Sequence, residues 1–165
     1  MNALARLIGT VFYVGHMRPA PGTWGSFAAL PLAYLLYQLG GFWLFLIATI
    51  AVFFVGWWAT IEMTKGAEDH DPSEIVVDEV AGQWIALLPV LHGTWMLDLG
   101  ALALLPGWVA AFVLFRAFDI TKPWLVGWAD RRDDALGVML DDVIAGIFAG
   151  LGVLALAALF HLVIM

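Results

Sequence analysis

Apolar residues occur along the chain in five long blocks, separated by short polar or glycine-containing stretches. The blocks cover about residues 26–39, 42–61, 75–91, 99–117 and 143–164. Residues 41–61 contain no charged side chain, and a helix of that length crosses a hydrocarbon layer about 30 Å thick. The pattern predicts an all-α fold: a polytopic membrane helix bundle with about four to five membrane-embedded helices, in a single domain covering residues 1–165.

Two of the blocks are weak as membrane spans. Block 26–39 would rise only about 21 Å as a helix, and Pro31 interrupts it. Block 75–91 is short and contains acids, so both blocks are assigned partly by counting which loops share a side. A further apolar stretch, 7–15, follows Arg6 without a convincing signal-peptide cleavage site. It is expected to remain as an N-terminal helix associated with the membrane.

The composition agrees with a lipid environment. Hydrophobic residues make up 63% of the chain and charged residues 13%, and the mean hydropathy is +0.93. The chain has no cysteine, which excludes disulfides, thiolate nucleophiles and thiolate metal sites. A net charge of −7 argues against nucleic acid as a partner, because a phosphate backbone binds to basic surfaces. Membrane lipids are the expected surroundings.

The charged residues are distributed unevenly between the two sides of the predicted bundle. All seven Lys and Arg residues lie before the first block, after the second, or from the end of the fourth block onward. The two other connections, 38–41 and 89–98, contain no charged residue apart from Asp98. The positive-inside rule therefore places the three charged loops, with every acid except Asp98, on the cytoplasmic side.

Cap residues predict that a helix begins at the sequence DPSE. Asp71 suits the N-cap, Pro72 the first helical position and Glu74 the third. Asp78 and Glu79 would then lie about two turns into that helix. Small residues predict close packing between helices, and the pair of glycines at 146 and 150 is expected to pack within the bundle rather than to form a dimer face. A homo-oligomer is left open.

Acidic residues gather at the cytoplasmic ends of different blocks. The groups are Asp69, Asp71 and Glu74 with Asp78 and Glu79; Asp119; Asp130, Asp133 and Asp134; and Asp141 with Asp142. Carboxylates at the edge of hydrocarbon are costly and repel one another, and Arg116 and Lys122 are too few to neutralise them. Because oxygen ligands without cysteine suit a hard divalent cation, we expect Mg²⁺ at this edge.

The helix macrodipole offers another explanation for some of these acids. It favours anions at helix N-termini, where four of them are expected: Asp71, Glu74, Asp141 and Asp142. It does not apply to Asp78 and Glu79, two turns into a helix, or to Asp119 near a helix C-terminus. We therefore interpret Asp78, Glu79 and Asp119 as functional.

The remaining acids carry weaker signals. Asp130 is left open between a functional and a surface role. Asp133 and Asp134 lie in the charged sequence DRRDDALG and are expected on the solvated surface. Asp98 is alone on the far side and is interpreted as structural.

The sequence PGTWGS at 21–26 is the other polar phrase near an apolar block. Thr23 and Ser26, with two glycines, lie just before the expected helix, where free N–H groups can bind phosphate. An ordinary helix cap has the same residues, so the signal is weak alone. His70 is a candidate proton donor, although a single loop histidine more often faces solvent.

Four of these phrases together resemble the phosphatidylglycerophosphatase A family. They are PGTWGS (21–26), HDPSEIVVDEVAGQW (70–84), FRAFDITKPW (115–124) followed by Asp130, and LGVMLDDVIAG (136–146), and they span nearly the whole chain in the family's order. One departure is that Ala135 and Leu136 stand where the family commonly has two glycines.

The resemblance implies a magnesium-dependent phosphatase of the bacterial inner membrane, with its active site facing the cytoplasm. It would remove the terminal phosphate of phosphatidylglycerophosphate to give phosphatidylglycerol. Five carboxylates would hold one or two Mg²⁺ ions: Asp78, Glu79, Asp119, Asp141 and Asp142. Four side chains would hold phosphate oxygens: Thr23, Ser26, Arg116 and Lys122. Asp71 would join these acids in catalysis, and the sequence leaves open whether a carboxylate acts as general base or attacks directly.

Two other functions are alternatives. A carboxylate-lined divalent cation transporter would place acids near mid-membrane on several helices, whereas here the acids collect at one edge. A phosphatase that acts on another lipid phosphate is the nearer alternative.

Overall fold

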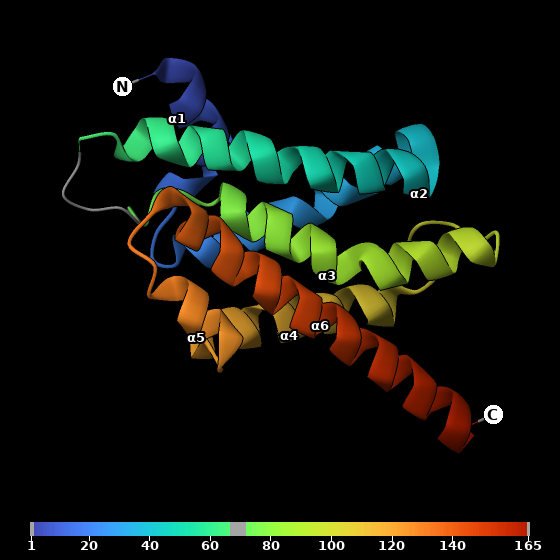
Figure 1. Cartoon of the computed structure of the whole chain (residues 1–165). Coiled ribbons are helices and arrows are strands. Elements are labelled where there is room, and N and C mark those ends of the chain that lie inside the picture. The colour runs from blue at the N-terminus through green and yellow to red at the C-terminus, as the bar shows by residue number, and fades with distance from the viewer. Residues whose placement is uncertain (1, 67–71, 165) are drawn as a thin grey trace.

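The computed structural model of the chain describes residues 2–66 and 72–164 (Figure 1). Every regular element in these ranges is a helix, which confirms the predicted all-α class. The elements are α1 (Ala3–Gly9), a 3₁₀ turn η1 (Val14–His16), α2 (Pro21–Thr64), α3 (Val77–Met96), α4 (Leu105–Thr121), α5 (Leu125–Asp130) and α6 (Ala135–Ile164).

Helix α2 consists of two arms that fold back on each other. The helical backbone breaks at Gly40 and Gly41, and Gly41 has φ +65°, a conformation that glycine adopts without strain. The second arm then runs back toward the end at which the first began (Figure 1). The first arm starts at Pro21 rather than near residue 26, so it rises about 27 Å to Leu39, and Pro31 lies inside it without ending it.

Two helices in the described part of the chain, Pro21–Thr64 and Ala135–Val163, are long and apolar enough to cross a membrane. The predicted number of four to five membrane-embedded helices stays a prediction. Large apolar side chains cover much of the outside of the bundle, among them Ile47, Phe54 and Leu151, which are 63%, 57% and 59% exposed. Such a surface suits lipid better than water.

The N-terminal segment differs from the predicted helix over 7–15. Helix α1 ends at Gly9, and the next residues, Val11–Tyr13, have positive φ angles of 48–68°. Thr10 holds this turn, because its hydroxyl oxygen accepts a hydrogen bond from the Tyr13 N–H at 3.0 Å. The apolar stretch is therefore a helix end and a tight turn.

Two helices begin elsewhere than the cap residues predicted. The Val76 N–H donates to the carbonyl of Gly9 at 2.9 Å, and this long-range bond keeps the segment before α3 out of a helix. Helix α3 therefore begins at Val77, and the prediction of a start at Asp71 and Pro72 was wrong. Helix α6 begins earlier than expected, at Ala135, because an Asp134 carboxylate oxygen accepts from the Gly137 N–H at 2.7 Å.

Helices α3 and α6 cross with their backbones in contact. A Cβ atom added to Gly82 would lie 2.6 Å from the backbone oxygen of Asp142, and one added to Gly146 would overlap the Gly82 carbonyl. Gly150 of α6 faces the backbone oxygen of Ile85 on α3. The glycines thus pack within the bundle, as predicted, and they bring the first turns of α3 beside the acids of α6.

Candidate active site

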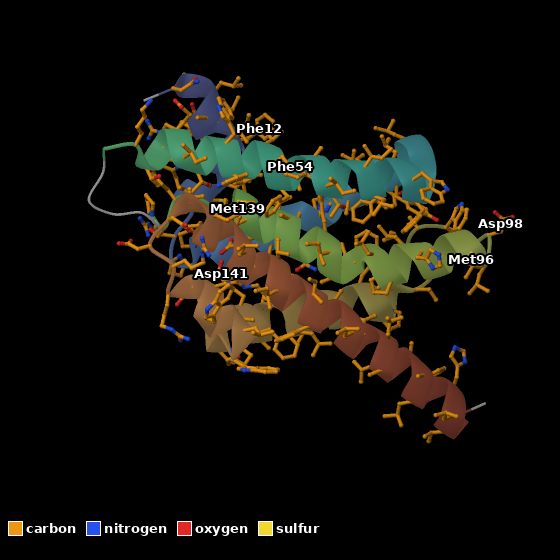
Figure 2. The ribbon with its side chains drawn as sticks, in the orientation of Figure 1. Phe12, Phe54, Met96, Asp98, Met139 and Asp141 are labelled. Atoms are coloured by element: carbon orange, nitrogen blue, oxygen red, sulfur yellow. The ribbon has the colours of Figure 1, made fainter. Side chains whose placement is uncertain are left out.

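Carboxylates from α4 and α6 meet at one end of the bundle. Asp119, Asp141 and Asp142 are buried, and each offers an oxygen that lies within 4.8 Å of those of the other two. Figure 2 places Asp141 at this end and Asp98 and Met96 at the opposite end. The structure therefore brings together three of the predicted site residues, at the end away from Asp98.

The acids of α6 do not lie at a helix N-terminus, contrary to the prediction. Because α6 begins at Ala135, Asp141 and Asp142 lie almost two turns inside it, where the macrodipole no longer favours them. Asp142 is 2% exposed, and the negative charges of Asp119, Asp78, Asp141 and Glu79 all repel its own. Close packing of α6 against α3 accounts for the position of Asp142. Its negative charge therefore has to be balanced by a nearby positive charge.

Asp78 and Glu79 lie in the first turn of α3, so the prediction that they sit two turns in was also wrong. The macrodipole of α3 favours both carboxylates there. Asp78 is buried and accepts a hydrogen bond from the Glu79 N–H at 2.9 Å. Glu79 extends toward the first turns of α2, where a Cβ atom added to Gly25 would lie 2.7 Å from its Oε2. Larger residues at 22 and 25 would displace this carboxylate.

Arg116 links three helices. Its Nη1 lies 2.6 Å from Asp119 Oδ2 on α4 and 3.5 Å from Glu79 Oε1 on α3. It also donates to the hydroxyl of Ser26 on α2 at 3.2 Å. One guanidinium group therefore partly balances two of the buried acids.

Lys122 follows the end of α4 and faces two acids. Its Nζ donates to Asp141 Oδ2 at 2.9 Å and also contacts Asp130 at the end of α5. Partial burial alone would lower the pKa of Lys122, but the hydrogen bonds and charges of Asp130 and Asp141 outweigh that effect and hold the pKa above its usual value. Lys122 thus links Asp130, whose role the sequence left undecided, to Asp141 of the predicted site.

Thr23 and Ser26 lie inside α2 rather than before it, which corrects the prediction. Ser26 is fully buried, donates to the carbonyl of Gly22 at 2.9 Å and receives the bond from Arg116. Thr23 is half-buried in the first turn. The phrase PGTWGS therefore supplies the first turns of a helix that faces Glu79 and Arg116.

The other predicted polar residues lie apart from this cluster or outside the described residues. Asp71 and His70 lie outside the described residues. Asp134 lies on the surface as predicted, where its hydrogen bond from Arg132 and that from the Gly137 N–H hold its pKa below the usual value. Asp98 is exposed at the far end.

Several buried polar atoms of the cluster lack a hydrogen-bond partner. They are Glu79 Oε2, Asp142 Oδ2, Arg116 Nε and both amide atoms of Gln83. Gln83 was not identified from the sequence, because the prediction relied mainly on charged residues and this side chain is neutral. Its spacing of four residues from Glu79 nevertheless places it on the same face of α3. The unpaired oxygens, next to an excess of acids over bases, fit a bound cation with oxygen ligands.

Comparison with known proteins connects this cluster to a family. A family model described as Phosphatidylglycerophosphatase A matches residues 7–157. A phosphatidylglycerophosphatase A of Haemophilus influenzae is 38% identical over 153 residues, covering 91% of this chain and 86% of that protein. A phosphatidylglycerophosphatase A of Escherichia coli is 34% identical over 146 residues, covering 87% of this chain and 77% of that protein.

A third relative carries a different name. A Bacteroides thetaiotaomicron protein, named as a candidate phosphatidylinositol-3-phosphatase, is 38% identical over 148 residues, or 87% of each chain. No solved structure matches. The family match covers all the described residues of the acidic cluster, and two relatives share the family's name over most of their length. The chain belongs to the phosphatidylglycerophosphatase A family.

Proposed function

We propose that this chain is a magnesium-dependent phosphatase that converts phosphatidylglycerophosphate to phosphatidylglycerol at the cytoplasmic face of the bacterial inner membrane. The names of two relatives support the reaction. The observation that carries the proposal is the buried convergence of Asp119, Asp141 and Asp142, whose oxygens lie within 4.8 Å of one another. Three carboxylates at that spacing repel one another unless a cation lies among them.

Five carboxylates would hold the Mg²⁺: Asp78, Glu79, Asp119, Asp141 and Asp142. All are buried or nearly so, and Glu79 and Asp142 each have an oxygen without a partner. When bound, Mg²⁺ supplies charge neutralisation for the phosphate and acidifies a water molecule. Without such a cation, an acidic cluster would repel a phosphomonoester.

The basic residues of the cluster would bind the substrate phosphate. Arg116 offers a guanidinium group that can donate two parallel hydrogen bonds to phosphate oxygens, and Ser26 holds that group in place. Lys122, which stays charged across the physiological range, would add a second positive charge, with Thr23 at the start of α2. A carboxylate of the site, for which Asp71 remains the predicted candidate, would accept the proton of the attacking water.

The dimensions of α6 support a site at the membrane rim. From Asp142 to Ile164 the helix rises about 33 Å, close to the thickness of the hydrocarbon layer. A phosphate at the rim is where a lipid headgroup lies. The charge distribution of the sequence supports a cytoplasmic location for this rim.

Phosphate release from phosphatidylglycerophosphate by detergent-solubilised protein tests the proposal. We expect release in Mg²⁺ that stops when EDTA is added. Asp142→Asn should lower kcat by at least about 100-fold, because it removes charge from the centre of the cluster. Asp98→Asn at the far end is the matched control and should keep full activity. Equal release with and without EDTA would contradict the metal requirement.

The third relative makes another lipid phosphate the second candidate substrate. Phosphatidylinositol 3-phosphate, tested under the same conditions, distinguishes the two. A higher kcat/KM for this lipid would replace the proposed substrate and leave the proposed metal site unchanged.

A further inference from the structure

Gln83 is a neutral side chain whose position none of the preceding roles explains. It is 0% exposed, and neither its Nε2 nor its Oε1 has a hydrogen-bond partner. A buried amide without partners costs free energy, so its position calls for an explanation, and a bound ligand is one. Most of the other unpaired buried atoms in the described part belong to Glu79, Arg116 and Asp142, which are site residues.

The position of Gln83 relative to Glu79 follows from helix geometry. Four residues separate them on α3, so both project from the same face, and Gln83 lies about 6 Å farther from the acidic end. Glu79 on this face meets Arg116 of α4 and the first turns of α2. Gln83 therefore lies one helical turn deeper in the bundle, on the face of α3 that carries Glu79.

An amide has different binding chemistry from the groups at the acidic end. Carboxylates accept hydrogen bonds and bind cations, whereas Arg116 and Lys122 only donate. The amide of Gln83 can donate and accept at the same time, as can an alcohol. A hydroxyl group is thus a ligand that can satisfy both of its atoms together.

We propose that Gln83 binds the headgroup hydroxyl next to the phosphomonoester, and so selects lipids with a polyol headgroup. This inference rests on the proposed function. In such a lipid the phosphate is the outermost group, and the hydroxyl-bearing carbons lie between it and the acyl chains. With the phosphate at Arg116 and the acyl chains in the hydrocarbon, the hydroxyl falls on the inner side, where Gln83 lies.

The test compares two substrates that differ by one hydroxyl group. One is phosphatidylglycerophosphate, and the other is its analogue with a propane-1,3-diol linker in place of the glycerol linker. The unaltered protein should show a kcat/KM about tenfold higher for the hydroxylated lipid, as expected for one well-made hydrogen bond. Gln83→Met, similar in size and shape, should lose that preference, so that its kcat/KM becomes equal for the two lipids.

Gln38 provides the matched control, since it is an exposed glutamine near the Gly40–Gly41 break in α2 that donates to the Tyr34 hydroxyl. Gln38→Met should keep the tenfold preference. Gln83→Leu repeats the test should the methionine variant fold poorly, and the thermal stability of each variant in detergent reports folding separately. An equal loss on both lipids, or a retained preference, would overturn the inference. Absence of phosphate release from both lipids with the unaltered protein would instead remove the proposed function.

Discussion

Arg116 and Asp119 illustrate how single residues carry the chemistry of this fold. They lie three residues apart near the end of α4, and their side chains form an ion pair with an N–O distance of 2.6 Å. A carboxylate near a helix C-terminus is disfavoured by the macrodipole, so Asp119 depends on this partner. The residue types and their separation can be read from the sequence. The unpaired atoms of Gln83 cannot, because they depend on which helices surround the amide.

At the residue scale, Asp119→Asn tests the acidic cluster most directly. The amide keeps the shape but removes the charge that lies beside Asp141 and Asp142, so binding of a cation should weaken strongly. We expect phosphate release to fall by at least about 100-fold, while the protein still inserts into the membrane. Near-normal turnover of the purified variant would remove Asp119 from the site.

The helix boundaries show what lies beyond the reach of local sequence patterns. The two glycines at 40 and 41 predicted the break in α2, because glycine punctuates helices by itself. The start of α3 depends instead on a hydrogen bond between Val76 and Gly9, which are distant in the sequence. That single bond moves Asp78 and Glu79 from the second turn to the first. In the first turn the helix macrodipole favours both carboxylates, whereas it would not have done so farther inside the helix.

At the element scale, Gly146→Ala should disturb the crossing of α3 and α6. The added methyl group overlaps the Gly82 carbonyl, so the helices must separate. We expect a loss of about 1–3 kcal/mol of unfolding free energy, typical of overpacking, together with lower activity because Asp142 moves. Gly100→Ala is the control, since nothing lies within 4 Å of the added atom. Equal thermal stability of the two variants in detergent would contradict the prediction.

At the scale of the whole molecule, the polar cluster and Asp98 lie at opposite ends (Figure 2). The sequence predicted this separation from the distribution of charge alone, because loops on one side of a membrane share its charge preference. It did not predict that the first turns of α2 and Arg116 of α4 would together enclose Glu79. That enclosure depends on small residues at several helix contacts. A small residue in the sequence does not by itself show which helix it will contact.

The predicted orientation can be measured because the chain has no cysteine. Ser73→Cys lies just before α3, at the end that bears the acids, and Met96→Cys lies at the other end. In intact spheroplasts, a membrane-impermeant maleimide should label the cysteine at 96 and leave the one at 73 unlabelled until the membrane is permeabilised. The reverse pattern would place the acidic end outside the cytoplasm.

The confinement of the acidic cluster to one end of the bundle has a consequence for the bilayer itself. A phosphomonoester carries about 1.5 to 2 negative charges at neutral pH. Hydrolysis at a single rim would remove those charges from one leaflet and leave the number of lipids in each leaflet unchanged. Turnover would therefore make the surface potential less negative on one face only, and the membrane would acquire an electrical asymmetry without any lipid crossing it.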